Sequence, residues 1–223
     1  MKTALFIPIK LNNQRLPGKN VLDLCGRPLC DYIFRTVRDL AVVEEKFVYC
    51  SDTSIRQYIP SGIDFLKRDS CLDSPEVKGT DIISAFLQDV NADIYVITHA
   101  TQPFTKGTSI ESALIKVKSG EYDSAFSAME MYDYCWFDGK PLNYSMDEVV
   151  VTQELKPVYK ETGAFYIFRR EVFASLGRRI GSKPYIFIVD AFEAIDVDTA
   201  EDFRLAEAAA AYLNEGARRN GKH

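Results

Sequence analysis

Cysteine is scarce in this sequence, and its spacing matches no framework that cysteines usually build. The 223 residues include five cysteines, an odd number, and no two of them form a C-x-x-C pair. This pattern argues against a disulfide framework and against a zinc site. We therefore expect the five thiols to be buried or incidental side chains.

Long apolar runs are also missing. No stretch approaches the length of a membrane-spanning helix, and the first residues lack the ordered charged, apolar and small-residue regions of a secretory signal. We therefore expect a cytoplasmic protein with no membrane partner. The net charge of −5 also argues against a nucleic-acid partner, because such proteins usually carry a broad basic surface.

The composition is that of one compact domain. With 47% hydrophobic residues, the chain can bury a single large core, and its length favours one domain over residues 1–223. Short apolar runs that resemble buried strands alternate with amphipathic segments. The candidate strands are residues 3–9, 46–50, 93–98, 124–129, 164–168 and 185–189. This alternation predicts an α/β fold in which helices cover both faces of a mostly parallel sheet.

Helices are expected between these strands. Pro28 fits the first position of a helix, and Thr108 and Glu111 have the spacing of a capping box that opens another. An alanine-rich final helix is predicted over residues 199–213. The charged end, residues 215–223, lacks an apolar face, so we expect it to fray.

A basic loop follows the first candidate strand. Lys10, Arg15 and Lys19 all precede Asp23, the first acidic residue, so the loop over residues 10–20 is positive in an otherwise acidic protein. Such a cluster suits a polyanion. The loop contains neither G-x-x-x-x-G-K-[ST] nor G-x-G-x-x-G, so side-chain charge would supply most of the attraction to phosphate. The alternative is an exposed, solvated loop.

Two carboxylates near the other end form a second constellation. Asp196 and Asp198 alternate with Ile195 and Val197, so an extended segment would bury the apolar pair and direct both carboxylates to one side. This arrangement suits Mg²⁺, which joins one or two carboxylates to substrate phosphates. The alternative is that Asp198 or Thr199 caps the following helix while Asp196 is solvated. Capping and metal binding are compatible with each other.

Taken together, these segments resemble a known family, the cytidylyltransferases that activate acylneuraminate and 3-deoxy-manno-octulosonate. The resemblance covers nearly the whole chain. It is carried by residues 10–20, 26–29, Arg68, 79–81, 162–166 and 194–199. It implies a three-layer α/β/α nucleotidyltransferase fold, related to the Rossmann fold, with a small dimerisation hairpin.

The same resemblance implies a reaction. The anomeric hydroxyl of a 2-keto acid sugar would attack the α phosphorus of CTP, giving a CMP-sugar and pyrophosphate. Lys10, Arg15 and Lys19 would hold the phosphates, and Asp196 and Asp198 would bind Mg²⁺. A metal-associated water or Asp198 would accept the hydroxyl proton. Such a transfer depends on positioning and charge neutralisation, so no nucleophilic side chain is expected.

Recognition of the two substrates also follows from the resemblance. The residues implied for the nucleotide are Asn20, Arg68, Thr80, Asp81 and His99, and those implied for the sugar are Gln153, Thr162 and Tyr166. Four of these residues also have an interpretation that does not depend on the resemblance. Arg68 would be a solvated surface residue, Thr80 a helix cap, Tyr166 a core tyrosine and His99 a buried, satisfied histidine.

Residues 132–160 interrupt the alternation of strands and helices. Aromatic residues accumulate there around Asp138-Gly139, a hairpin turn signal. In the family resembled, this region carries a dimerisation element, so we predict a homodimer in which this insertion contributes to the interface and the sugar site. The alternative is an aromatic hairpin packed on the protein's own core.

Several positions depart from the family pattern. His99 begins a segment where sialate-activating members have Gln-Pro-Thr-Ser-Pro, Thr152 stands where an arginine is frequent, and Thr162 stands where asparagine is usual. These changes point away from sialic acid itself and towards a related acid sugar. They also leave open an alternative function, a catalytically degenerate nucleotide-binding or assembly subunit of the same fold.

Overall fold

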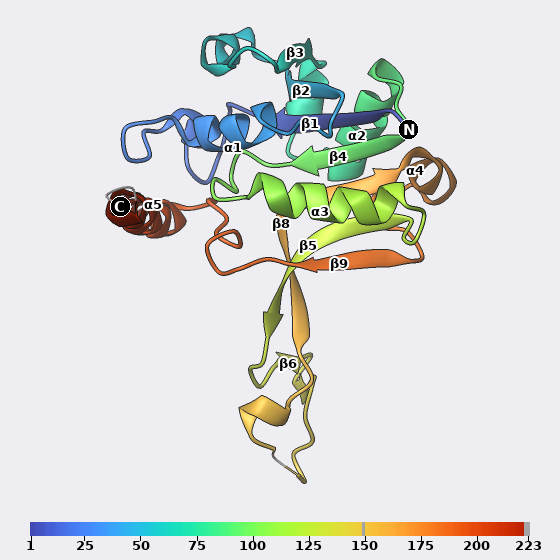
Figure 1. The fold of residues 1–223 in the computed structure, drawn as a ribbon, viewed down its shortest axis with the longest axis vertical. Coiled ribbons are helices and arrows are strands. Elements are labelled where there is room, and N and C mark those ends of the chain that lie inside the picture. Colours follow the sequence, from blue (N-terminus) through green and yellow to red (C-terminus); the bar gives the residue numbers. More distant parts are fainter. Residues whose placement is uncertain (149, 221–223) are drawn as a thin grey trace.

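A seven-stranded sheet forms the centre of the molecule (Figure 1). The computed structural model describes residues 1–148 and 150–220, with the backbone alone for 216–220. The strands of the sheet are β1 (Thr3–Ile9), β2 (Glu45–Cys50), β3 (Asp64–Lys67), β4 (Ile94–Thr98), β5 (Ser124–Met131), β8 (Val158–Arg169) and β9 (Pro184–Ile188). Their order is β3-β2-β1-β4-β8-β5-β9. Every adjacent pair is parallel except those of β8 with β4 and β5, so the predicted mostly parallel sheet is confirmed.

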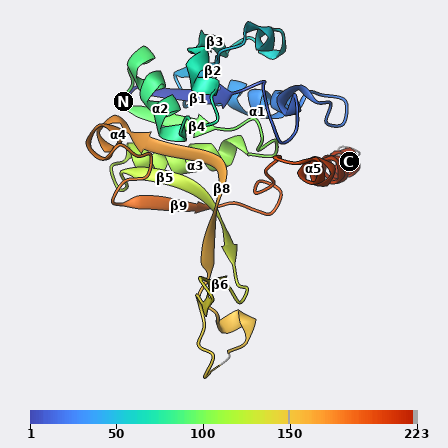
Figure 2. The ribbon, with the colours of Figure 1, turned by 180° about the vertical axis from the view of Figure 1, so that it is seen from behind.

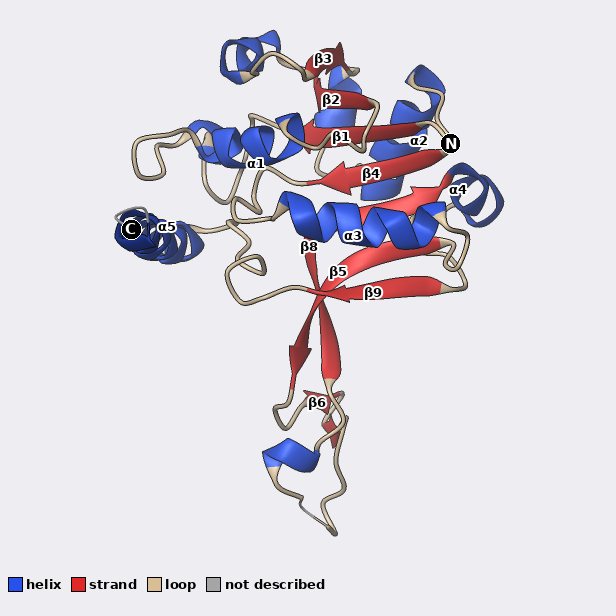
Figure 3. Ribbon diagram, in the orientation of Figure 1, coloured by secondary structure: helices blue, strands red, loops and turns tan. Residues whose placement is uncertain are grey.

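Helices cover both faces of this sheet (Figures 1 and 2). The α-helices are α1 (Leu29–Arg38), α2 (Gly79–Asp89), α3 (Gly107–Lys118), α4 (Arg170–Leu176) and α5 (Ala200–Asn220). Short 3₁₀ helices are η1 (Lys19–Val21), η2 (Thr53–Tyr58), η3 (Ser70–Asp73) and η4 (Thr152–Glu154). Figure 3 shows α1 and α3 in front of the sheet with α2 behind it. The chain therefore has the predicted three layers.

The burial of the central strands explains why they were recognisable. All five residues of β4 are buried, and six of the seven in β1. Side chains on one face of β1 pack with α1 and α3, while Phe6 on the other face stacks on Phe86 of α2 with ring centroids 3.9 Å apart. A strand enclosed on both faces needs a continuous apolar run. β3 has no buried residue, so its sequence carries no such run, and the sequence analysis missed it.

Helix starts differ from the predicted ones. Pro28 is the residue before α1 and has an extended ψ of 140°. The capping box predicted at Thr108 is wrong, because α3 begins at Gly107 and its first turn is held by the carboxylate of Glu193. That carboxylate accepts hydrogen bonds from the Lys106 backbone N–H at 2.9 Å and from the Ser109 hydroxyl at 3.1 Å. A remote carboxylate thus replaces the local cap.

An arm, defined here as residues 132–160, projects from the lower edge of the sheet on the extended ends of β5 and β8 (Figure 1). It carries the short hairpin β6 (Trp136–Phe137) and β7 (Lys140–Pro141), whose turn has Asp138 and Gly139 at φ 50° and 72°. The Asp-Gly turn is therefore confirmed. The hairpin does not pack on the core, since Trp136 and Phe137 are 55% and 73% exposed.

The last helix continues beyond its predicted end. α5 extends to Asn220, where the sequence predicted a frayed segment over 215–223, and residues 221–223 lie outside the described part of the chain. Ala206 and Ala210 pack α5 against Leu24 and Leu29. Within residues 1–148 and 150–220, no helix combines the length and apolar character needed to cross a membrane.

Candidate functional site

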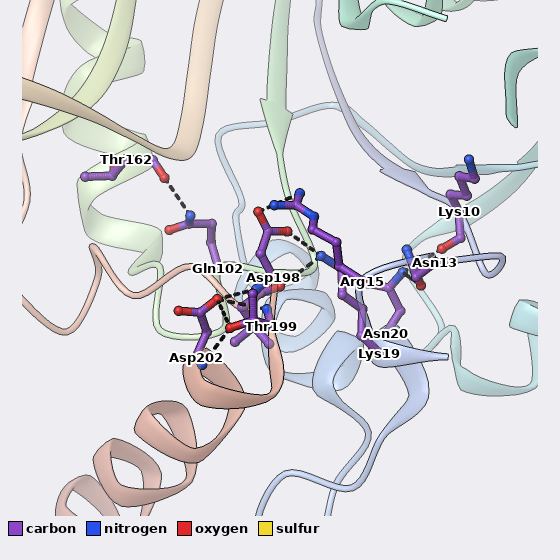
Figure 4. A network of polar contacts seen from close by, with 11 residues as sticks. Lys10, Asn13, Arg15, Lys19, Asn20, Gln102, Thr162, Asp198, Thr199 and Asp202 are labelled. Atoms are coloured by element: carbon purple, nitrogen blue, oxygen red, sulfur yellow. Dashed lines mark hydrogen bonds and ion pairs between the residues drawn. The ribbon is translucent and has the colours of Figure 1, made fainter. Parts of the chain in front are cut away.

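The basic loop and the late carboxylates meet in space (Figure 4). Lys19 donates through Nζ to Asp198 Oδ1 at 2.6 Å and to the carbonyl oxygen of Val197 at 2.9 Å. Arg15 Nη2 lies 2.8 Å from Asp198 Oδ2. Lys19 is almost buried, whereas Arg15 is 68% exposed in its side chain, so one cation is fixed and the other reaches in from solvent. The structure therefore joins residues nearly 180 positions apart into one charged site.

Asn20 holds the basic loop in shape. Its Nδ2 donates to the carbonyl oxygen of Lys10 at 2.8 Å and to Asn13 Oδ1 at 3.4 Å, and the residue is only 4% exposed. Gly18, at φ 65°, turns the chain into η1 just before it. Lys10, Arg15 and Lys19 line a cavity of about 260 Å³ that this closed loop surrounds. We call it the loop cavity.

The segment that carries the carboxylates is fixed by its own backbone. Val197 is fully buried and donates its N–H to the carbonyl oxygen of Thr101 at 2.9 Å. Asp202 Oδ2 accepts the backbone N–H of Thr199 at 2.8 Å and its hydroxyl at 2.9 Å. Thr199 and Asp202 thus cap α5, which leaves the carboxylate of Asp198 free for Arg15 and Lys19. Helix capping and the charged site coexist, each with its own residues.

Asp196 lies beside Asp198 and is exposed. Partial desolvation raises the pKa of Asp196 above its usual range, and the negative charge of Asp198 acts in the same direction. No group of three or more His, Cys, Asp or Glu side chains suited to a metal occurs within the described part of the chain. Two neighbouring carboxylates beside a basic loop suit a hard cation that retains water and binds phosphate.

A second cavity continues from the loop cavity, and the two share Lys10 and Pro75. It has a volume of about 340 Å³, and we call it the central cavity. Arg68, His99 and Arg179 supply most of its polar lining together with Lys10. The two joined cavities form one cleft at the carboxyl ends of β1 and β4, where ligands of parallel sheets usually bind.

Arg68 is buried in the wall of the central cavity, which contradicts the alternative of a solvated surface residue. Its side chain is 1% exposed and its Nη2 lies 2.5 Å from Asp73 Oδ1. Its Nη1 donates to the carbonyl oxygen of Tyr49 at 3.4 Å, whereas its Nε is buried without a partner among the described residues. A buried guanidinium N–H without an acceptor is costly, and the Arg68 side chain lies in the wall of the central cavity.

Thr80 and Asp81 lie in the first turn of α2, directly after Gly79, which lines the central cavity with Arg68. Asp81 Oδ2 accepts the backbone N–H of Lys78 at 2.8 Å, so Asp81, and not Thr80, closes the first turn of the helix. Thr80 lines a neighbouring cavity together with Lys78. The structure therefore brings Arg68 to the central cavity and places Thr80 and Asp81 beside it.

His99 lies in the cleft and is also held from behind. Its Nδ1 is 2.7 Å from the carbonyl oxygen of Gly163. Because a carbonyl only accepts, Nδ1 carries the proton and Nε2 of the neutral ring is an acceptor. Burial lowers the pKa of His99, more than the Gly163 hydrogen bond raises it. His99 is therefore hydrogen-bonded at one nitrogen, as the alternative of a satisfied histidine predicts, and it also lines the central cavity.

The residues implied for the sugar lie in different surroundings. Tyr166 is 3% exposed, its hydroxyl donates to Glu161 at 2.8 Å, and burial raises its pKa to about 12. Thr162 is 7% exposed and donates its hydroxyl to Ser127 Oγ at 2.9 Å, at an irregularity in the β5–β8 pairing. Gln102 donates to the Thr162 carbonyl oxygen at 2.5 Å. Thr162 is thus used inside the sheet and not in the cleft.

Gln153 lies in η4, on the arm, and is exposed. Figure 1 shows this part of the arm far below the sheet, so a single chain does not bring Gln153 to the cleft. The sequence analysis also missed Arg179, which lines the central cavity from the loop between α4 and β9. Only the basic pair Arg178-Arg179 marks that loop in the sequence, and two adjacent cations on their own predict an exposed turn.

Comparison with known proteins gives a consistent result. A family model described as cytidylyltransferase matches residues 4–206. An N-acylneuraminate cytidylyltransferase from Streptococcus agalactiae is 25% identical over 214 residues, which cover 91% of this chain and 52% of that protein. An 8-amino-3,8-dideoxy-manno-octulosonate cytidylyltransferase from Shewanella oneidensis is 25% identical over 244 residues, covering 93% and 98%. The chain thus spans about half the length of the Streptococcus relative.

Solved structures show the same fold. A CMP:2-keto-3-deoxy-manno-octonic acid synthetase complexed with CTP superposes with a TM-score of 0.72 at 19% identity, covering 96% of this chain and 100% of that one. A 4-diphosphocytidyl-2C-methyl-D-erythritol synthase from Anaerococcus prevotii gives 0.67 at 12% identity, covering 94% and 98%. These likenesses support the predicted α/β nucleotidyltransferase fold.

Proposed function

Because this chain belongs to the cytidylyltransferase family, we propose that it transfers CMP from CTP to a 2-keto acid sugar and releases pyrophosphate. The observation that carries the proposal is the meeting of Arg15 and Lys19 with Asp198 at the mouth of a cleft. Such a transfer needs fixed cations for the triphosphate and a carboxylate site close to them. The chain supplies both in one place.

The basic loop would bind the triphosphate. Lys19 is held by the Val197 carbonyl oxygen and is almost buried, so its ammonium is already positioned before a nucleotide arrives. The Arg15 side chain is exposed, and it would turn from Asp198 to a phosphate oxygen of the nucleotide. A guanidinium can bind such a group through two hydrogen bonds. Lys10, on the wall shared by both cavities, would contribute a third charge.

Asp196 and Asp198 would hold Mg²⁺. When bound, the ion would neutralise charge on the phosphates as the α phosphorus is attacked. The two carboxylates fit this role because they lie side by side on one extended segment and face Lys19. Asp198 currently neutralises two cations, so nucleotide phosphates would replace it at Arg15 and Lys19 and leave it available to the ion.

The nucleoside would occupy the central cavity. Arg68 offers a buried Nε without an acceptor, and Asp73 fixes its orientation. A donor of this kind suits a carbonyl oxygen of the base or a hydroxyl of the ribose. Asn20 and Asp81 would act indirectly, since they hold the loop and the start of α2. His99 would face the sugar from the lining of this cavity, while Tyr166 would act through Arg179, which lies over its ring.

The arm would make a homodimer. It leaves Trp136, Phe137 and Met146 exposed, far from the core, and such a set of apolar side chains usually marks an interface. Gln153 would reach a cleft only in a second copy of the chain. We therefore extend the proposal to a pair of chains in which the arm contributes to the interface.

A direct test is to incubate the protein with CTP, Mg²⁺ and a panel of N-acetylneuraminate, 3-deoxy-manno-octulosonate and its 8-amino analogue, while pyrophosphate is measured. Release that requires both an acid sugar and Mg²⁺ is the expected result. CTP binding that is independent of Mg²⁺, with no pyrophosphate from any acceptor, would contradict the proposal. It would favour a nucleotide-binding or assembly subunit without activity.

A further inference from the structure

Arg179 lies where two cavities meet. It lines the central cavity and also a neighbouring cavity of about 610 Å³, which we call the side cavity. The side cavity is lined by three cations, Lys78, Arg178 and Arg179, and by one carboxylate, that of Glu161. The protein as a whole has a net charge of −5, so a cavity with more cations than carboxylates stands out and favours an anionic ligand.

The Arg179 guanidinium is oriented but not neutralised. Its Cζ lies 3.5 Å from the centroid of the Tyr166 ring, which is close enough for stacking. Across the described residues, Arg179 takes part in no ion pair, whereas Arg15 and Arg68 each pair with an aspartate. The Glu161 carboxylate in the same cavity accepts the Tyr166 hydroxyl. Tyr166 thus holds the guanidinium in place, and the positive charge of Arg179 is left for an anionic ligand.

The loop that carries Arg179 is anchored on both sides. Gly177 ends α4 at φ 63° just before it. After it, the Gly181 N–H donates to Ser124 Oγ at 2.8 Å, and the Ser182 and Lys183 N–H groups donate to Asp123 Oδ2 at 2.7 and 2.9 Å. A Cβ atom at Gly181 would overlap the Asp123 carboxylate, so the close approach requires glycine. The position of Arg179 is thus built into the fold.

Arg179 belongs to the same continuous cleft as the basic loop. Both Arg179 and His99 line the central cavity, and the positive charge of Arg179 contributes to the lowered pKa of His99. Lys10 lines the central cavity as well and also the loop cavity, where Arg15 and Lys19 lie. A ligand that extends from the loop cavity into the central cavity would therefore meet Arg179.

We infer that Arg179 binds the carboxylate of the acidic acceptor and so determines that the chain accepts acids in preference to neutral sugars. This inference rests on the proposed function. In a 2-keto acid the carboxylate is attached to the anomeric carbon, so holding it would also orient the attacking hydroxyl. A planar guanidinium matches a carboxylate through two parallel hydrogen bonds. A neutral sugar would leave this charge desolvated and unpaired.

The test begins with Arg179→Gln, Arg179→Lys and the control Lys183→Gln. Lys183 is on the same loop and lies over another ring, that of Tyr122 at 5.7 Å, but lines neither cavity. With the acid that supports turnover, Arg179→Gln should raise the acceptor KM roughly 10- to 100-fold, as expected for a lost charge-assisted hydrogen bond. The CTP KM should stay within about twofold. Arg179→Lys should lie in between, and Lys183→Gln should match the parent protein.

A second arm of the test changes the ligand. Binding of N-acetylneuraminate, 3-deoxy-manno-octulosonate and the methyl ester of each is measured by calorimetry, which needs no turnover. The parent protein should prefer an acid to its ester, and Arg179→Gln should bind both equally weakly. Equal effects of Arg179→Gln on acid and ester, or a rise in the CTP KM alone, would overturn the inference, as would a parent protein that binds none of the acids.

The two proposals fail in different ways. Acid binding that depends on Arg179, with no pyrophosphate released, would reject the proposed function and retain the carboxylate site. Pyrophosphate release with an unchanged acceptor KM in Arg179→Gln would retain the proposed function and reject the carboxylate site. Melting temperatures of all variants show whether each is folded, and Arg179→Lys keeps the charge over the Tyr166 ring if Arg179→Gln proves unstable.

Discussion

The cleft and the arm differ in how far one chain satisfies their side chains. In the cleft, important contacts join distant parts of the sequence, such as Lys19 to Asp198, and Arg15, Lys19 and Arg68 each pair with an aspartate. In the arm, hydrogen bonds such as Asn143 to the Asp133 carbonyl oxygen span about ten residues, and large apolar side chains are exposed. The cleft is therefore assembled by the fold of one chain, while the arm leaves large apolar side chains uncovered.

This difference predicts which changes affect chemistry and which affect assembly. Removing a charge from the cleft should reduce turnover without changing the oligomeric state. Removing apolar side chains from the arm should change the oligomeric state and leave the affinity for CTP unchanged. The variants below test this difference between the cleft and the arm, in decreasing order of expected effect.

Asp198→Asn should have the largest effect. It removes a carboxylate of the proposed Mg²⁺ site, so turnover should fall by a factor on the order of 10²–10³ or more. It also leaves Lys19 almost buried without its ion pair, which should lower the free energy of unfolding by about 1–2 kcal/mol. Pyrophosphate release and denaturant titration measure the two effects. Asp196→Asn is the matched control, since Asp196 is exposed and should lose turnover with little loss of stability.

Exchanging Trp136 and Phe137 for serine should weaken dimerisation by roughly 10- to 100-fold in dissociation constant, because exposed aromatic side chains often dominate interface energetics. Sedimentation at several protein concentrations would measure it. CTP affinity should not change, since the hairpin lies far from the cleft (Figure 1). A double variant that remains a dimer while losing CTP affinity would reverse the assignment of the two regions.

Thr162→Val tests a residue that the resemblance places against the sugar and the structure places inside the sheet. Its hydroxyl donates to Ser127, so the variant should lose about 1 kcal/mol of stability. The acceptor KM should be unaltered. If the KM rose while thermal and denaturant stability held, Thr162 would belong to the sugar site after all.

His99 should give the smallest effect, a difference in pH dependence. Burial lowers its pKa, so the folded state binds a proton less readily than the unfolded state. The stability contributed by the neutral ring is complete above the ordinary pKa of 6.5 and is lost as the pH falls through the folded pKa. Denaturant titrations above and below that value should show a decline that His99→Gln lacks. An imidazole signal that titrates at or above 6.5 would contradict the assignment.

The central layers of this fold could be predicted because burial on both faces imposes a continuous apolar run. β1 was predicted with its observed bounds, and β4 and β9 to within one residue at each end. The start of α3 was not predictable, since its cap is Glu193, which follows it by more than 80 residues. A sequence pattern next to a helix reflects only interactions between neighbouring residues. A cap supplied by a distant part of the chain therefore cannot be predicted from the residues at the start of the helix.

The same reasoning divides the site. Lys19 and Asp198 were selected because charge stood out against an acidic background and because carboxylates alternated with apolar residues. Arg179 was missed, because an arginine pair in a turn is common and its significance comes from the Tyr166 ring beneath it. Thr162 is the opposite case. It was selected because it belongs to a family motif, but its hydroxyl donates to Ser127 within the sheet.

The measurement that tests the account most directly is the affinity for CTP of the parent protein and of Lys19→Ala, determined by calorimetry with Mg²⁺ present. Lys116→Ala serves as the control, because Lys116 pairs with Glu121 on an exposed part of α3. The account predicts that Lys19→Ala weakens CTP binding roughly 10- to 100-fold, as expected for a positioned phosphate contact, while Lys116→Ala has no effect. Equal CTP affinity in all three proteins would contradict the claim that the two ends of the chain meet to form a nucleotide site.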